Sequence, residues 1–210
     1  MVNRSVSEMQ TARYTRRMNS LLPAEESPTR TRLLDAAAEL FYNDGVSAGV
    51  EHLCRVAGVS KRSMYQLFDS KDELIAASLA RSIPGYLSQL ISDTDESLEP
   101  RTRIMLVFER LEHVIVDPSF RGCPYVSAAM ELKSESHPAR LVARQFHTTL
   151  TNYFYQAAAD GGARNPLLVA QQLTMIHDGA TARAVVQDLP SPGLSVATAG
   201  TLLDCAGLTA

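Results

Sequence analysis

A short stretch of the 210-residue chain, "SKRSMYQLFDSK" at residues 60–71, concentrates cationic, phenolic and amide side chains. On a helix these groups share one face: Lys61, Arg62, Tyr65 and Gln66. Met64 and Phe68 fall on the opposite side, which predicts one polar face and one buried face. Arginine can pair with a guanine edge, glutamine with an adenine edge, and lysine with phosphate oxygens. The spacing therefore predicts a face that binds nucleic acid.

Two short helices joined by a glycine turn would position this face. The stretch 50–57 repeats apolar residues at helical spacing, and its expected buried side is Val50, Leu53 and Val56. Ser47 is a candidate N-cap for this helix, and Gly58 permits a sharp turn before a second helix over 61–68. This is the pattern of a helix-turn-helix, whose second helix enters the DNA major groove.

The rest of the chain predicts helices without a strand pattern or internal repeat, so we expect an all-α fold. The first helix should open at Pro28 and end at Gly45 in a left-handed cap. Ser70 and Glu73 predict a capping box for a long helix that bends or stops at Pro84–Gly85. Further helices are expected from Pro100 past Ile115, and over about 125–133, 138–159, 166–187 and 194–206.

Charge is unevenly distributed along the chain, although its net charge is −3 and its sequence pI about 6.0. The segment 1–27 is expected to be a flexible basic tail that either contacts DNA or stays free. The stretch 53–71 carries several cations against Asp69 alone. Local positive clusters on a mildly acidic body permit a DNA-binding face without a basic protein.

Other chemistries have little support in the sequence. The three cysteines, Cys54, Cys123 and Cys205, have no metal-type spacing, and no histidine pair lies four residues apart, so neither a metal nor another cofactor is expected. Cys123 is either an oxidant-sensing thiol or a quiet, half-buried one. No leader or membrane span is expected, which favours the cytoplasm. Without a nucleophile elbow, a phosphate loop or an HExxH motif, we do not expect an enzyme.

Residues 32–74 as a whole resemble the N-terminal DNA-binding domain of the tetracycline-repressor (TetR) family. The resemblance covers about a fifth of the chain. The matching residues are Ala36–Ala37, Leu40–Phe41, Gly45, Ala57–Gly58–Val59–Ser60, Tyr65, Phe68, Lys71 and Leu74. It implies three short DNA-binding helices, followed by helices that dimerise and usually enclose a small-molecule pocket. The last two helices, about 166–187 and 194–206, would pair with those of a second copy.

These observations give one main hypothesis, a homodimeric repressor that a small, mostly apolar ligand releases from a near-palindromic DNA operator. Its expected domains are 28–75 for DNA and 76–210 for regulation and dimerisation. The expected DNA contacts are Ser60, Lys61, Arg62, Ser63, Tyr65, Gln66 and Lys71. The candidate ligand contacts are Met105, Phe108, Tyr125, Met130, His147, Phe154, Met175 and His177. The alternatives are a ligand-independent regulator or activator and, more remotely, an enzyme that uses the C-terminal domain.

Overall fold

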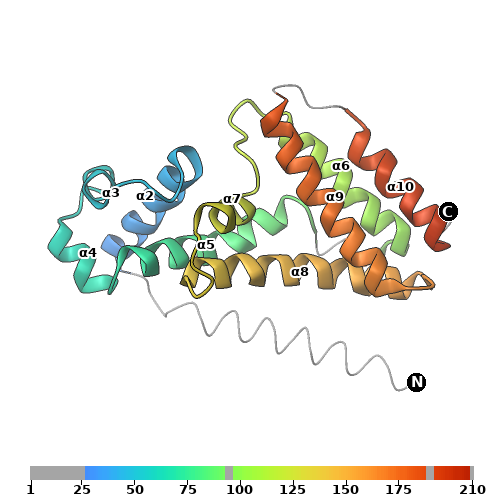
Figure 1. The fold of residues 1–210 in the computed structure, drawn as a ribbon, viewed down its shortest axis with the longest axis horizontal. Helices are drawn as coiled ribbons and strands as arrows, with labels where there is room; N and C mark the ends of the chain where they lie inside the picture. Colours follow the sequence, from blue (N-terminus) through green and yellow to red (C-terminus); the bar gives the residue numbers. More distant parts are fainter. Residues whose placement is uncertain (1–26, 93–96, 188–191, 209–210) are drawn as a thin grey trace, which may run out of the picture.

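The computed structural model describes residues 27–92, 97–187 and 192–208, and within these ranges its regular structure is helical. The helices are α2 Pro28–Asp44, α3 Val50–Ala57, α4 Lys61–Leu67, α5 Lys71–Ser88, α6 Pro100–Ile115, α7 Pro124–Glu131, α8 Pro138–Asp160, α9 Pro166–Val186 and α10 Leu194–Ala206 (Figure 1). The predicted all-α class is confirmed, and apart from the C-terminal end of α5 the predicted ranges agree to within about two residues. The expected basic tail lies outside the described residues, apart from Ser27.

Side-chain caps and prolines begin most helices where the sequence indicates. The Ser27 hydroxyl accepts a hydrogen bond from Arg30 N at 3.2 Å, which starts α2. Ser70 does the same for Glu73 N at 3.1 Å, which starts α5. Prolines occupy the first turn of α2, α6, α7, α8 and α9: Pro28, Pro100, Pro124, Pro138 and Pro166. Proline fits there because a first-turn N–H has no helical partner to lose.

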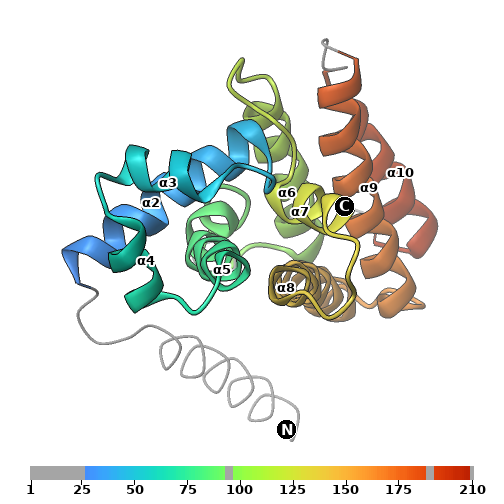
Figure 2. The ribbon, with the colours of Figure 1, turned by 60° about the vertical axis from the view of Figure 1, so that its left-hand side comes forward.

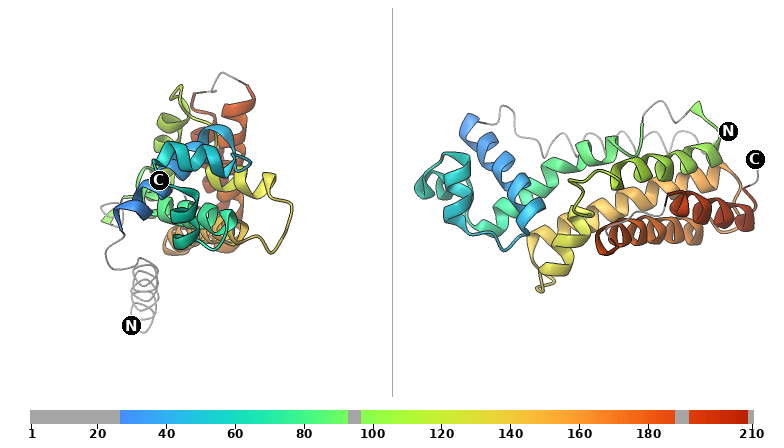
Figure 3. Two further views of the ribbon diagram at one scale, coloured as in Figure 1. Left: turned by 90° about the vertical axis from the view of Figure 1, so that its left-hand side faces the viewer. Right: turned by 90° about the horizontal axis from the view of Figure 1, so that it is seen from above.

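The helices form a small group and a larger group, joined by α5. Helices α2, α3 and α4 lie at one end, and α6 to α10 fill the other (Figures 1 and 3). Helix α8 packs against α5, α7, α9 and α6, whereas α10 packs against α6 and α9. Helix α5 contacts both α2 and α8, so it belongs to both groups (Figure 2). Any movement of the larger group relative to the smaller one must therefore involve α5.

The core runs through both groups. Leu33, Leu53 and Met64 are completely buried between α2, α3 and α4. In the larger group the Tyr125 and Phe146 rings stack at 4.1 Å, and Tyr86 from α5 meets both edge-on. Burying each large apolar side chain contributes about 1.5–3 kcal/mol, so this core fixes α5 against both sets of neighbours.

Two expectations about α3 are wrong. Its N-cap is Gly49 rather than Ser47, and no side chain caps it. Val56 is 47% exposed instead of buried, because α3 packs through the adjacent positions Leu53, Cys54 and Ala57. The outward face of α3 is consequently wider than the sequence pattern indicates.

Glycine and proline also behave differently from expectation at two helix positions. Gly45 has a positive φ of 80° but an extended ψ of 170°, so it ends α2 without the left-handed cap conformation. Helix α5 does not stop at Pro84, which was one of the two alternatives, but continues to Ser88. Pro84 has no N–H, so the Ala80 carbonyl, four residues earlier, lacks its helical donor. Ala80 is exposed, so water can satisfy that carbonyl.

Candidate nucleic-acid interface

A left-handed glycine sets the angle between α3 and α4. Gly58 has φ 63° and ψ 35°, and its N–H bonds back to the carbonyls of Cys54 and Arg55. Glycine adopts this conformation without the steric cost that a Cβ imposes. Ser60 then caps α4, because its hydroxyl accepts a hydrogen bond from Ser63 N at 3.0 Å. The turn predicted from the sequence is therefore present and capped on both sides.

The inner face of α4 is anchored on the rest of the small group. Met64 is fully buried and Phe68 is 1% exposed. The Met64 sulfur lies 3.8 Å from that of Cys54 on α3, and the Arg30 guanidinium lies 4.4 Å from the centre of the Phe68 ring. These contacts hold α4 in one orientation on α2 and α3, so its other face is fixed outward.

The outward face of α4 carries the side chains that the sequence pattern places there. Four of them are exposed: Lys61, Arg62, Tyr65 and Gln66. Tyr65 is 52% exposed, which is unusual for a ring that could have packed inward. The face thus offers two cations, an amide and a phenol to a partner, all on one rigid helix.

Lys61 has a partner that the sequence pattern missed. Its Nζ lies 2.5 Å from Oε1 of Glu51, in the first turn of α3. The hydrogen bond between them raises the pKa of Lys61 and lowers the pKa of Glu51. The pair joins residues ten positions apart across the glycine turn, so only the angle between the helices reveals it.

Three other expected DNA contacts also make bonds within the protein. The Ser60 hydroxyl lies 2.9 Å from the Ser63 hydroxyl in the cap of α4. Lys71 is half-buried at the start of α5, and its Nζ donates to Val46 O at 2.7 Å. This burial lowers the pKa of Lys71 from its ordinary value. Each group keeps hydrogen-bonding capacity, since a lysine has three donors and a hydroxyl can both donate and accept.

The loop between α2 and α3 is held from two sides. Val46 N donates to Oε2 of Glu131, at the end of α7, at 3.0 Å, while the Val46 carbonyl accepts the bond from Lys71. A Cβ on Gly45 would lie 2.8 Å from the same Glu131 oxygen, so glycine allows this close approach. A helix of the larger group therefore touches the loop that leads directly into the helix-turn-helix.

The eight candidate ligand contacts are dispersed through the larger group. Phe108, Tyr125 and Phe154 are completely buried in the packed core. Met130 and Met175 are instead 70% and 67% exposed. Met105 packs at the edge of the core, and the remaining two are histidines of α8 and α9, His147 and His177. None of the eight lines either of two cavities in the described part of the chain.

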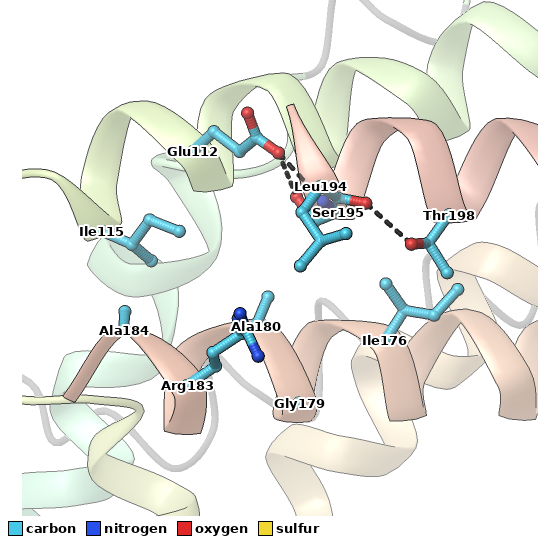
Figure 4. Close-up of a pocket in the computed structure, with 10 residues that line it drawn as sticks. All are labelled: Glu112, Ile115, Ile176, Gly179, Ala180, Arg183, Ala184, Leu194, Ser195 and Thr198. Atoms are coloured by element: carbon cyan, nitrogen blue, oxygen red, sulfur yellow. Dashed lines mark hydrogen bonds between the residues drawn. The ribbon is translucent and has the colours of Figure 1, made fainter. Parts of the chain in front are cut away.

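An apolar cavity of about 290 Å³ lies between α6, α9 and α10 (Figure 4). Its lining is Glu112, Ile115, Ile176, Gly179, Ala180, Arg183, Ala184, Leu194, Ser195 and Thr198. A second, more open hollow lies where α2, α5 and α6 end, and Tyr42, Arg110 and His113 are among its lining residues. The first is the more suitable for a small apolar molecule, because alkyl side chains make up most of its wall.

Glu112, in the wall of the first cavity, ties α6 to the start of α10. Its Oε1 accepts hydrogen bonds from Ser195 N at 3.0 Å and from the Ser195 hydroxyl at 2.8 Å, and its Oε2 accepts one from Gly193 N at 2.5 Å. Burial alone would raise the pKa of Glu112, but these hydrogen bonds together lower it. Glu112 therefore acts as an N-cap supplied by another helix.

A second polar group is buried between α8 and α9. His177 is completely buried, and its Nδ1 lies 3.1 Å from Oδ1 of Asp178. His147 Nδ1 lies 3.6 Å from the other oxygen of that carboxylate. Nevertheless, no group of three or more His, Cys, Asp or Glu within the described ranges could hold a metal ion.

Burial also raises the pKa of the Cys123 thiol to about 11, which keeps it protonated and unreactive at neutral pH.

The glycine turn, the buried inner face of α4 and its polar outer face define a helix-turn-helix DNA-binding protein. The family model for "Bacterial regulatory proteins, tetR family" matches residues 33–78. A crystal structure of a protein described as a TetR transcriptional regulator, from Streptomyces avermitilis, is 49% identical, with a TM-score of 0.83. That match covers 88% of this chain and 100% of the other. The chain therefore belongs to the TetR family of transcriptional regulators.

Other relatives agree on this class. The transcriptional activator FasR of Mycolicibacterium smegmatis is 33% identical over 57% of this chain, and the regulator UidR of Escherichia coli K12 is 40% identical over 27%. The chain spans 59% of the length of FasR and 29% of that of UidR. A TetR-family regulator from Streptomyces coelicolor is 25% identical, with a TM-score of 0.76 over 86% of this chain and 90% of its own. These relatives are regulators rather than enzymes, as the sequence predicts. No helix in the described ranges has both the length and the apolar character needed to cross a membrane.

Proposed function

We propose that this protein is a homodimeric, cytoplasmic repressor that binds a near-palindromic DNA operator and leaves it when a small, mostly apolar ligand binds. The observation that carries the proposal is the outward polar face of α4, fixed by its buried Met64 and Phe68. In a dimer, two such helices would enter successive major grooves about 34–36 Å apart. Residues 28–75 form the DNA-binding domain in this proposal, and 76–210 form the regulatory domain.

Within that face, we assign different roles to different side chains. Arg62 and Gln66 read bases, since both are exposed and their groups match guanine and adenine edges. The other five contact the DNA backbone: Ser60, Lys61, Ser63, Tyr65 and Lys71. Lys71 contributes mainly by holding the loop at Val46, because its ammonium is already half-buried there.

The dimer forms through α9 and α10 in this proposal. Leu168, Met175 and Val186 lie on one side of α9 and are 48%, 67% and 81% exposed. Leu194, which begins α10, is 45% exposed. A row of large apolar side chains on one helix face is typical of a surface that a protein partner covers. A second copy supplies a matching row by symmetry.

The effector is small and apolar because the cavity between α6, α9 and α10 holds about 290 Å³ and is lined mainly by alkyl groups. The cavity shares helices α9 and α10 with the proposed dimer face, so a molecule inside it can alter how two copies pack. It can shift the balance only by binding one arrangement more tightly than the other. The eight dispersed contacts predicted from the sequence stay predictions, although Met175 among them lies on the proposed dimer face.

Activation of transcription is the second candidate function. The support for it is that FasR, a relative matched over 57% of this chain, is named a transcriptional activator. An activator would use the same DNA face and the same dimer, but its presence at a promoter would raise transcription.

DNA binding by the purified protein tests the proposal. The probe is duplex DNA from beside the protein's own gene, with a random duplex of equal length as control, at near-physiological salt. Selective binding with a Kd of about 10⁻⁸ M or tighter is expected. Weak, salt-sensitive binding to both duplexes would contradict it. Transcription from the bound promoter, with and without small apolar compounds, then separates a repressor from an activator.

A further inference from the structure

The ion pair between Lys61 and Glu51 lies on the surface that the proposed function turns toward DNA. Glu51 is in the first turn of α3 and Lys61 in the first turn of α4, the two helices of the helix-turn-helix. Their side chains are 83% and 51% exposed, so neither is held there by packing. The Nζ to Oε1 distance of 2.5 Å puts the ammonium in direct hydrogen-bond contact with the carboxylate oxygen.

A carboxylate in this position competes directly with the DNA backbone. An ammonium group binds a carboxylate oxygen or a phosphate oxygen through the same kind of charge-assisted hydrogen bond. Exposed ion pairs contribute little to stability, so a phosphate can displace Glu51. However, the displacement removes a favourable bond from the free protein and leaves a negative charge beside the phosphates.

We propose that Glu51 lowers the affinity of the helix-turn-helix for DNA of every sequence, because it holds the Lys61 ammonium that would otherwise be free for a phosphate. This inference rests on the proposed DNA face of α4. It makes Glu51 a determinant of affinity that contacts no base. By limiting binding through phosphates, Glu51 leaves a larger share of the affinity to the base-reading side chains.

The proposal predicts the salt dependence of DNA binding. When a lysine freed from its carboxylate binds a phosphate, it displaces condensed counterions from the DNA. Each such contact makes the slope of log K against log salt steeper by about 0.9. Glu51 keeps Lys61 from its phosphate in part of the wild-type complexes, so Glu51→Gln should tighten binding and steepen this slope by up to about 0.9. A slope change of about 0.9 means that the gain in DNA affinity of Glu51→Gln over wild type shrinks about three- to fourfold between about 50 and about 200 mM salt.

The experiment compares wild type, Glu51→Gln, Lys61→Met and the double variant on the gene-adjacent duplex and on random DNA. Glu135→Gln, which removes an exposed acid from the loop after α7, is the control and should change nothing. Glu51→Gln should tighten binding to both duplexes by a similar factor. When Lys61 is replaced by Met, the gain in affinity from Glu51→Gln should fall to less than half, because Glu51 acts through its ion pair with the Lys61 ammonium.

Two results would overturn the inference. One is an unchanged affinity and slope for Glu51→Gln. The other is an equal gain with and without Lys61, which would mean direct repulsion between Glu51 and DNA. Arg62→Ala in the same assay separates this failure from that of the proposed function. If Arg62→Ala weakens operator binding while Glu51→Gln changes nothing, only this inference fails. If Arg62→Ala also has no effect, α4 is not the DNA-reading helix.

Discussion

The two ends of the molecule present opposite kinds of surface. At the α3–α4 end, apolar side chains such as Met64 are buried and the charged and amide groups of α4 face outward. On α9 the arrangement is reversed, since Met175 and Val186 face outward while His177 is completely buried. Both surfaces belong to helices of one chain, so in the proposed function the difference follows from what each surface would bind rather than from how each helix folds.

In the proposed dimer, the contrast favours a short-lived complex with DNA and a long-lived contact between the two copies. A charged face is well hydrated when it is free, so it can release its partner without a large cost, and salt tunes that balance. An apolar face loses about 25 cal/mol for each Å² left in water, which favours a permanent partner. In a ligand-controlled regulator, the DNA must come and go while the dimer persists, and the two surfaces fit these requirements.

Introducing a charge into the apolar face should have the largest effect. In Met175→Asp, a carboxylate would have to be buried unpaired between two copies, so we expect a monomer. Loss of the second, linked half-site contact should then weaken operator binding by about 10²-fold or more. Sedimentation velocity and operator titration measure the two effects. Gln156→Asp, at an exposed position of α8, is the matched control. A Met175→Asp protein that remains dimeric would exclude this side of α9 from the interface.

Removing the exposed guanidinium of α4 should have the next largest effect. Arg62→Ala should weaken operator binding by about 1–3 kcal/mol and relax the preference for one base pair, because a bidentate base contact is lost. Arg55→Ala removes the same charge from the exposed side of α3 and should weaken all sequences alike. Competition assays with operator and random duplexes measure the difference. Equal losses on both duplexes in Arg62→Ala would assign Arg62 to phosphate instead of bases.

The contrast also explains how far the sequence could predict this structure. The helix-turn-helix follows from local signals, since Gly58 forms the turn, Ser60 caps α4, and Met64 lies one turn from Phe68. The Glu51–Lys61 pair was missed because it depends on the angle between two helices.

The helices of the larger group carry weaker local signals. Met130 and Met175 have the size and polarity of core residues, yet both are exposed. A helix of apolar residues on all sides does not reveal which side faces a neighbour. The cavity lining was unpredictable for the same reason, because the crossing of α6, α9 and α10 decides it.

The carboxylate that caps α10 should have a moderate effect on stability. Glu112→Gln should destabilise the protein by about 1 kcal/mol, since a neutral amide is a weaker acceptor at a helix N-terminus. In wild type the folded state depresses the pKa of Glu112, so its stabilising contribution is full above its ordinary value of 4.5 and is lost as pH falls through the lower, folded value. The difference in Tm between wild type and Glu112→Gln should therefore be larger at pH 7 than below pH 4.5. Glu109→Gln, exposed on the same helix, should behave like wild type, and a loss that is equal at both pH values would contradict a role for the charge.

The smallest expected effect concerns Lys71, at the boundary between the two groups of helices. Lys71→Met keeps the half-buried stem but leaves the Val46 carbonyl without its charged donor, so we expect a loss of about 1 kcal/mol, or a Tm lower by about 2–4 °C. DNA binding should weaken modestly on all sequences because the loop before α3 is less firmly held. If loop support is the main role, the salt slope stays unchanged, whereas a phosphate contact would lower it by about 0.9. Lys133→Met, which removes an exposed lysine after α7, controls for the loss of one positive charge. An unchanged Tm together with a lower slope would make the phosphate contact, rather than support of the loop, the main role of Lys71.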